Sequence, residues 1–125
     1  MRRVRVVLVE DNDVFREALE LLLGMRGEVD VVASVGDGAA AVAAALEHRP
    51  DVVLVDYRMP SVDGIQATTE LLAKVPGLAV VALTASADEG QREALLNAGA
   101  VLCLRKDQEL DEIVAAIRQA AAGVE

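Results

Sequence analysis

Five short runs of β-branched and aliphatic residues recur along this chain, and each is followed by a stretch with helical spacing. The apolar runs occupy residues 4–9, 29–34, 51–56, 78–83 and 100–104. Runs that are this short and almost continuously apolar are typical of strands buried on both faces of a parallel sheet. We therefore predict five strands that alternate with five helices, an order that indicates an α/β fold.

Helices are predicted where apolar residues repeat every three or four positions between the strands. They lie within residues 14–25, 39–47, 65–73, 89–98 and 110–121. Pro50 and Pro76 follow the second and third of these, where proline cannot extend a helix. Right-handed crossovers leave few ways to wind such units. We predict a doubly wound, five-stranded parallel sheet, flavodoxin-like (βα)5, with strand order 2-1-3-4-5.

Composition limits the class of protein. A chain of 125 residues with 54% hydrophobic content suits one compact domain. Its apolar runs are far shorter than the ~20 residues of a membrane span, so we expect a cytoplasmic protein without membrane contact. The formal net charge of −9 argues against nucleic-acid binding by this chain, because phosphate contacts depend on clustered Lys and Arg. The single cysteine, Cys103, cannot form an internal disulfide.

Charged and hydroxyl residues stand at the carboxyl ends of four predicted strands. They are Glu10, Asp11, Asp56, Thr84 and Lys106. In a sheet of order 2-1-3-4-5, ligands gather beyond these ends, between the first and third strands. Three carboxylates ~5 Å apart would repel by about 3 kcal/mol per pair at an effective dielectric near 20, so the cluster needs a cation or shifted pKa values.

Magnesium fits such a cluster, because it prefers oxygen ligands and typically uses one or two carboxylates, several waters and a substrate phosphate. A carboxylate nucleophile beside the metal, facing a lysine and a hydroxyl, has the parts needed for phosphoryl transfer to an aspartate. The pattern therefore indicates a magnesium-dependent phosphoryl chemistry at the carboxyl ends of the strands.

The residues at the strand ends belong to four motifs that resemble, in order and spacing, those of a response-regulator receiver domain. The motifs are Val-Leu-Val-Glu10-Asp11-Asn, Asp51-Val-Val-Leu-Val-Asp56-Tyr-Arg-Met-Pro60-Ser-Val-Asp63-Gly64, Ala82-Leu-Thr84-Ala85 and Leu104-Arg-Lys106. The resemblance covers essentially the whole chain. It implies a phosphorylation switch of two-component signal transduction, rather than an enzyme, with a sensor histidine kinase as partner.

The resemblance also implies a role for each acidic residue. Asp56 would be the phosphoacceptor. Magnesium would be bound directly by Asp11 and Asp56, through water by Glu10, and by the main-chain carbonyl of Arg58.

Three further residues would read the phosphoryl group, by the same resemblance. Thr84 would turn its hydroxyl toward it, Lys106 would pair with one phosphoryl oxygen, and the amide of Ala85 would donate to another. These contacts would pull the loop after the fourth strand inward and bias a two-state equilibrium.

Two positions depart from the family pattern. Cys103 stands where an aromatic residue is usual, which is open to three interpretations: a signal carried by the backbone alone, a reactive thiol sensor, or a small buried hydrophobe, the last being favoured. Asp107 follows Lys106 where many receivers have proline, so we expect a trans peptide bond there. Lysine followed by aspartate resembles the NarL/FixJ subfamily, whose members carry a C-terminal LuxR-type helix-turn-helix domain.

Other functions were weighed against the same residues. A flavin mononucleotide carrier would need a phosphate loop after the first strand, where Glu10, Asp11 and Asp13 would repel phosphate. An aspartate-nucleophile phosphatase normally has a second aspartate two residues after the nucleophile, and here that residue is Arg58. A stand-alone receiver and a receiver-like scaffold that works without phosphate remain as alternatives.

We expect residues 1–125 to be the receiver domain of a longer transcription regulator, with a C-terminal DNA-binding domain outside this chain. Phosphorylation would then act by changing homodimerisation or by releasing a covered DNA-binding domain. The fourth helix, fifth strand and fifth helix form the surface expected to change, and the first and fifth helices are the alternative interface.

Overall fold

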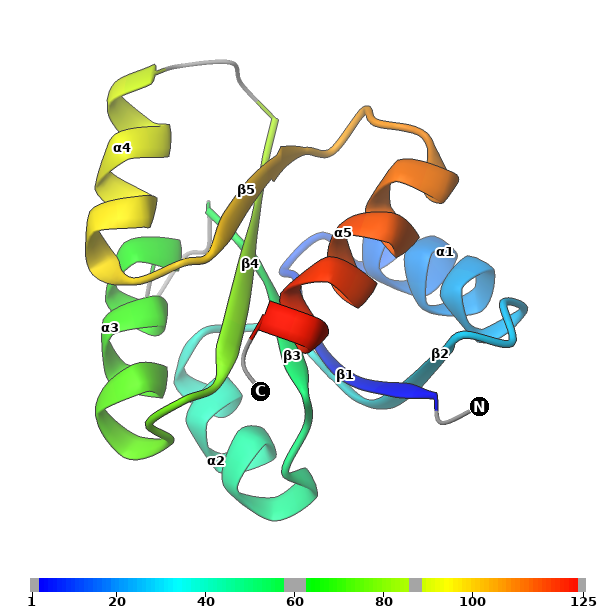
Figure 1. Cartoon of the computed structure of the whole chain (residues 1–125), viewed down its shortest axis with the longest axis horizontal. Coiled ribbons are helices and arrows are strands. Elements are labelled where there is room, and N and C mark those ends of the chain that lie inside the picture. Colours follow the sequence, from blue (N-terminus) through cyan, green and yellow to red (C-terminus); the bar gives the residue numbers. More distant parts are fainter. Residues whose placement is uncertain (1–2, 58–62, 86–88, 124–125) are drawn as a thin grey trace.

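Five parallel strands form one sheet, and five helices alternate with them along the chain (Figure 1). The computed structural model describes residues 3–57, 63–85 and 89–123. The elements are β1 (Val4–Val9), α1 (Asp13–Gly24), β2 (Val29–Val35), α2 (Ala39–His48), β3 (Val52–Asp56), α3 (Gly64–Lys74), β4 (Ala79–Thr84), α4 (Glu89–Ala98), β5 (Leu102–Arg105) and α5 (Leu110–Gly123). The strand order is β2-β1-β3-β4-β5. The predicted fold class and strand order are confirmed.

Three strands begin one or two residues later than predicted, β3 at Val52, β4 at Ala79 and β5 at Leu102, and local hydrogen bonds account for the first and the last. Asp51 lies just before β3, and its carboxylate accepts a hydrogen bond of 2.9 Å from the amide of Arg5. Ala100 lies in the turn that closes α4, where Gly99 has a φ of +117° and the amide of Ala100 donates to the carbonyl of Leu95 at 3.1 Å. Local hydrogen bonds, rather than the apolar run as a whole, therefore determine where β3 and β5 begin.

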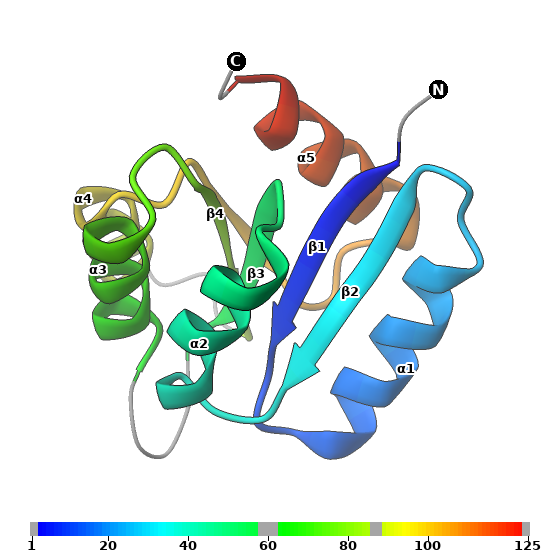
Figure 2. The ribbon, with the colours of Figure 1, turned by 90° about the horizontal axis from the view of Figure 1, so that it is seen from below.

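The helices cover both faces of the sheet (Figure 2). Helices α1 and α5 pack on one face, forming a two-helix core that includes Leu8, Leu19, Leu54 and Ile117. Helices α2, α3 and α4 pack on the other, forming a three-helix core that includes Val7, Ala41, Val53, Leu71 and Leu95. Strand residues alternate between the two cores, as side chains of a strand must. Because helices cover both faces of the sheet, ligands can reach the strands only at their ends.

The start of α3 lies against the residue that ends β3. The side chain of Asp63 caps this helix by accepting from the amide of Gln66 at 2.8 Å. The amide of Gly64 donates to the carbonyl of Tyr57 at 2.8 Å. A Cβ atom on Gly64 would lie 2.8 Å from the carbonyl oxygen of Asp56, so only glycine permits this approach. The contact fixes the backbone on which Asp56 stands.

Helix length and hydropathy were compared with the requirements of a membrane span. None of the helices in the described part of the chain is both long enough and apolar enough to cross a bilayer.

Candidate functional site

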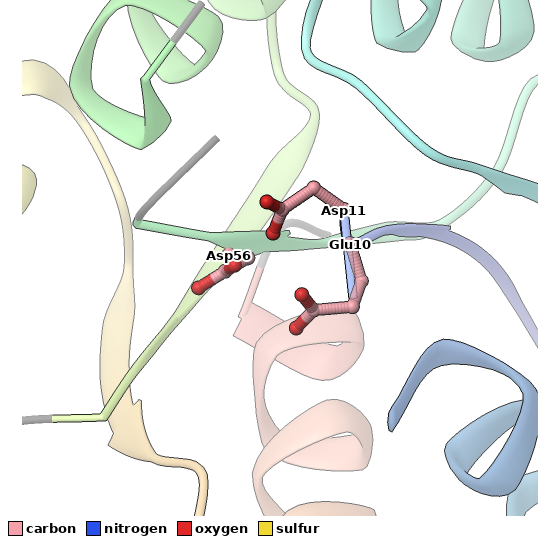
Figure 3. A group of neighbouring side chains, drawn as sticks. All are labelled: Glu10, Asp11 and Asp56. Carbon is pink, nitrogen blue, oxygen red and sulfur yellow. The ribbon is translucent and has the colours of Figure 1, made fainter. Parts of the chain in front are cut away.

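Three carboxylates converge at the carboxyl ends of β1 and β3 (Figure 3). Each of Glu10, Asp11 and Asp56 offers one oxygen, and these oxygens all lie within 4.8 Å of one another. Glu10 is fully buried and Asp56 is 3% exposed, whereas Asp11 is exposed to solvent. The parallel sheet produces this arrangement, because neighbouring strands end at the same edge.

A single ammonium group lies between the two buried carboxylates. Lys106 Nζ is 2.6 Å from Glu10 Oε1 and 3.1 Å from Asp56 Oδ2, and the lysine side chain is 20% exposed. Burial of an unpaired carboxylate is costly, so the lysine offsets part of the desolvation of both groups. Among the described residues, the ammonium of Lys106 nevertheless faces three carboxylates, which leaves an excess of negative charge in this group.

Glu10 is fixed by its backbone as well as by its side chain. Its amide donates to the carbonyl of Val35 at 3.0 Å. Its Oε2 accepts from the amide of Asn12 at 3.0 Å, and its carbonyl accepts from Arg16 Nη1 at 2.8 Å. The backbone of Glu10 is thereby held by two bonds, and its carboxylate cannot turn away without breaking the bond to Asn12 and the ion pair with Lys106.

Arg16 makes two of the contacts that shape this loop, and sequence reasoning missed it. Besides the bond to Glu10, its Nη2 forms an ion pair with Asp13 at 2.8 Å. A Cβ on Gly36 would lie 3.0 Å from Arg16 Nη1, so the glycine leaves room for the guanidinium between the β1 and β2 ends. The only available signal was an arginine in the first turn of the helix that follows an acidic pair.

Burial and neighbouring charge change the acidity of Asp56. Desolvation, together with hydrogen bonding to and repulsion by Glu10, raises the pKa of Asp56 to about 7, and Lys106 opposes this rise. For Lys106, burial favours the neutral amine, but the carboxylates of Glu10 and Asp56 outweigh it and raise the lysine pKa. Asp56 is therefore poised to exchange a proton for a cation near neutral pH.

The donor set suits a hard divalent cation. All three groups offer carboxylate oxygens, two of them are buried, and one of those has a raised pKa that added positive charge would lower. This acidic cluster could hold a metal ion. Arg58, whose carbonyl was predicted as a further ligand, lies outside the described residues.

The other predicted residues lie at the ends of β4 and β5. Thr84 ends β4 and is buried, and Ala85 follows it at the surface. The amide of Lys106 donates to the carbonyl of Thr84 at 2.7 Å. This bond joins the end of β4 to the segment that follows β5, so a movement of one would displace the other.

The two departures noted in the sequence can now be placed. Cys103 is half-buried on β5 and packs against the three-helix core, and burial raises the pKa of its thiol. A raised pKa reduces the thiolate fraction, which favours the small hydrophobe over the reactive thiol. The peptide bond between Lys106 and Asp107 is trans, as predicted.

Comparison with known proteins gives consistent matches. Residues 6–118 match the model of the response regulator receiver domain. The chain is 34% identical over 121 residues to the transcriptional regulatory protein DegU of Brevibacillus brevis, and 37% identical over 121 residues to the probable transcriptional regulatory protein NarL of Mycobacterium tuberculosis (strain H37Rv). Each alignment covers 97% of this chain but only 51% and 56% of those two proteins. The chain thus spans about half the length of the curated relatives that it matches.

Solved structures similar to this chain are also receiver domains of response regulators. The signal receiver domain of the putative response regulator NarL from Mycobacterium tuberculosis superposes with a TM-score of 0.93 at 36% identity, covering 98% of this chain and 99% of that one. The response regulator domain of Thermotoga maritima CheB superposes with a TM-score of 0.88 at 30% identity, covering 97% and 98%.

Proposed function

Because this chain belongs to the response-regulator receiver domain family, a family of signalling domains, we propose that it is a magnesium-dependent switch phosphorylated on Asp56. One observation carries the proposal. The carboxylate of Asp56 is almost fully buried beside two other carboxylates and the ammonium of Lys106, which is a costly arrangement without a ligand. A divalent cation and a phosphoryl group together would balance these charges.

Glu10, Asp11 and Asp56, with the carbonyl of Arg58, would hold the magnesium ion. When bound, the ion supplies positive charge that neutralises phosphoryl oxygens and keeps Asp56 ionised. The hydrogen bonds of Glu10 to Asn12 and Arg16 hold the β1 end in place for this task.

In the transfer step, an oxygen of the ionised Asp56 attacks the phosphorus of the donor in line with the leaving group. One oxygen–phosphorus bond forms, giving an acyl phosphate, and the donor's bond to phosphorus breaks with its electron pair leaving on the donor. In a sensor histidine kinase, the proposed physiological donor, that leaving group is an imidazole nitrogen. Lys106 offsets the charge of the transferred oxygens.

The phosphoryl group would then be read by the neighbouring loops. The hydroxyl of Thr84 and the amide of Ala85 would each donate to a phosphoryl oxygen, and the ammonium of Lys106 would pair with another. Because the backbones of Thr84 and Lys106 are joined at 2.7 Å, a shift of the β4 loop would move the β5 loop with it. Helix α4, strand β5 and helix α5 would therefore change their outer surface.

We further propose that residues 1–125 are the receiver part of a longer transcription regulator, with a helix-turn-helix domain outside this chain. Relatives that carry the name of transcriptional regulatory proteins are about twice as long as this chain. A net charge of −9 suits a domain that does not itself contact DNA. Phosphorylation would act on this output by shifting homodimerisation.

Intact-mass spectrometry after incubation with acetyl phosphate tests the central step. We expect one phosphoryl adduct in the presence of magnesium and none after chelation. Asp56→Asn should abolish the adduct. Asp111→Asn is the matched control, because Asp111 lies on α5 at the surface and pairs with Arg26, and it should leave the adduct unchanged. An adduct of the same yield on Asp56→Asn would remove the assignment.

A further inference from the structure

We propose that Phe15 is a positioning residue that holds the ammonium of Lys106 at the phosphoryl site through the face of its ring. The inference rests on the proposed phosphorylation of Asp56. Lys106 Nζ lies 4.8 Å from the centroid of the Phe15 ring. That distance is within the ~6 Å over which an ammonium is attracted to an aromatic face.

The ring has a fixed place in the molecule. The amide of Phe15 donates to Oδ1 of Asn12 at 3.0 Å, in the first turn of α1. The side chain is half-buried and packs against the two-helix core. Phe15 follows Asp11 by four residues, so the loop that carries Glu10 and Asp11 leads directly into the helix that carries the ring. One short segment, the loop after β1 with the first turn of α1, therefore carries two of the proposed metal ligands and also contacts the lysine.

The ring matters because the present partners of Lys106 would also bind the metal. The ammonium now contacts Glu10 Oε1 at 2.6 Å and Asp56 Oδ2 at 3.1 Å. A divalent cation at the same carboxylates would compete with the lysine for their charge. Lysine has a flexible four-carbon stem and would otherwise be free to leave the site. The ring remains as a partner that binds no metal.

An aromatic face also has an advantage over another carboxylate at this place. A further negative charge beside Lys106 would repel the incoming phosphoryl group. The ring attracts the cation through its quadrupole yet carries no net charge. Phe15 can therefore keep the ammonium in place before transfer without opposing the transfer itself.

The test uses the fact that the chain contains one phenylalanine. Biosynthetic replacement of phenylalanine by mono-, di- and trifluorinated analogues therefore alters residue 15 alone. Fluorine withdraws electron density from the ring face while changing its shape little. We expect the rate of phosphorylation by acetyl phosphate at saturating magnesium to fall stepwise, by about two- to tenfold in total. Magnesium affinity by calorimetry and the melting temperature should not change.

Two controls separate positioning from packing. In a Lys106→Gln background the fluorine series should have no effect on the residual rate, because no ammonium faces the ring. Nuclear magnetic resonance gives the second: the ε-methylene protons of Lys106 should show an upfield ring-current shift that persists when magnesium is added. Phe15→Leu should lose both the shift and the rate, with magnesium affinity retained.

The outcomes distinguish the inference from the function on which it rests. If the unmodified protein is phosphorylated and the fluorine series leaves its rate unchanged, the role of Phe15 is wrong and the function stands. An equal loss of rate in the Lys106→Gln background also overturns the role, since the ring would then act through packing. If the unmodified protein takes no phosphoryl group, both fail.

Discussion

The two ends of the parallel sheet use charged residues in opposite ways. At the amino end, Asp51 accepts from the amide of Arg5 at 2.9 Å, and Arg5 Nη2 donates to the carbonyl of His48 at 2.6 Å. Each charged group there satisfies a backbone group and closes a loop. At the carboxyl end, Asp56 and Glu10 face each other and share one ammonium.

This contrast separates charge that stabilises the fold from charge that the fold only tolerates. An ionised group that meets the needs of the backbone lowers the free energy of the folded state. Buried carboxylates that repel one another raise it, and such clusters persist when a ligand requires them. We therefore infer that the charged residues at the amino end stabilise the fold and that those at the carboxyl end serve the proposed function.

The largest effect is expected from Asp56→Asn and Asp51→Asn, two isosteric substitutions that should change the free energy of unfolding in opposite directions. The folded pKa of Asp56, about 7, exceeds its ordinary value of 3.8, so the folded state binds more protons between these values. Stability of the metal-free protein therefore falls as pH rises through this window. Asp56→Asn should remove that slope and stabilise the metal-free protein above neutral pH, by at most roughly 4 kcal/mol.

Asp51→Asn is the matched change at the amino end. It weakens a charge-assisted bond to the amide of Arg5 and should destabilise the protein by about 1 kcal/mol. Urea unfolding of both variants as a function of pH measures the two effects. A loss of stability in Asp56→Asn at alkaline pH would show that the carboxylate of Asp56 stabilises the fold as Asp51 does.

Magnesium should offset the repulsion among the carboxylates at the carboxyl end of the sheet and should have no such effect at the amino end. Ligand binding at one hundred times the dissociation constant stabilises a folded protein by about 2.7 kcal/mol. We expect the melting temperature to rise with magnesium, and Asp11→Ala to remove most of that rise. Asp111→Asn should keep it, because this carboxylate is 82% exposed and pairs with Arg26. An undiminished rise in Asp11→Ala would place the metal elsewhere.

Two arginines, one at each end of the sheet, allow the same contrast to be tested with smaller expected effects. Arg16→Ala removes a hydrogen bond to the carbonyl of Glu10, and Arg5→Ala removes one to the carbonyl of His48. Each should cost about 1 kcal/mol of stability. Only Arg16→Ala should also weaken magnesium binding, because Glu10 then loses a contact that holds its loop. Calorimetry that finds equal magnesium affinities in the two variants would contradict this division.

The smallest effect is expected at Cys103, which lies on β5 without a charged role. Cys103→Ala should cost on the order of 1 kcal/mol, as a small apolar group is lost from the three-helix core. Its phosphorylation rate should match that of the unmodified protein. Alkylation of the native thiol should be slow at neutral pH, because burial raises the thiol pKa. Rapid alkylation with loss of phosphorylation would revive the thiol sensor.

Much of the fold and of the arrangement of the site could be predicted from the sequence, because parallel sheets follow simple rules. Five short apolar runs indicated five strands, and the strand order determined which ends lie together. Glu10, Asp11 and Asp56 were therefore expected at one edge, because β1 and β3 are neighbours, and the structure also brings the ammonium of Lys106 from beyond β5 to Glu10 and Asp56. The predicted starts of β3 and β5 were wrong because local hydrogen bonds, at Asp51 and at the end of α4, determine where these strands begin. The apolar pattern of the sequence does not reveal such bonds.

The contacts around the site could not be predicted in the same way. Phe15 over Lys106, and Arg16 against Glu10, depend on how the first turn of α1 is rotated relative to the β1 loop. That rotation results from packing of the whole helix on the sheet, and no residue spacing encodes it. The raised pKa of Asp56 likewise depends on how deeply the carboxylate is buried, which the sequence alone does not give.

Chemical mapping can show which residue carries the phosphoryl group. An acyl phosphate is reduced by borohydride to the alcohol, so a phosphorylated aspartate becomes homoserine and can be located in a peptide digest. After incubation with acetyl phosphate and magnesium, we expect homoserine at position 56 and unreduced aspartate at Asp11 and Asp51. Without magnesium, no homoserine should form. Homoserine at another position, or the same yield at position 56 without magnesium, would contradict the account.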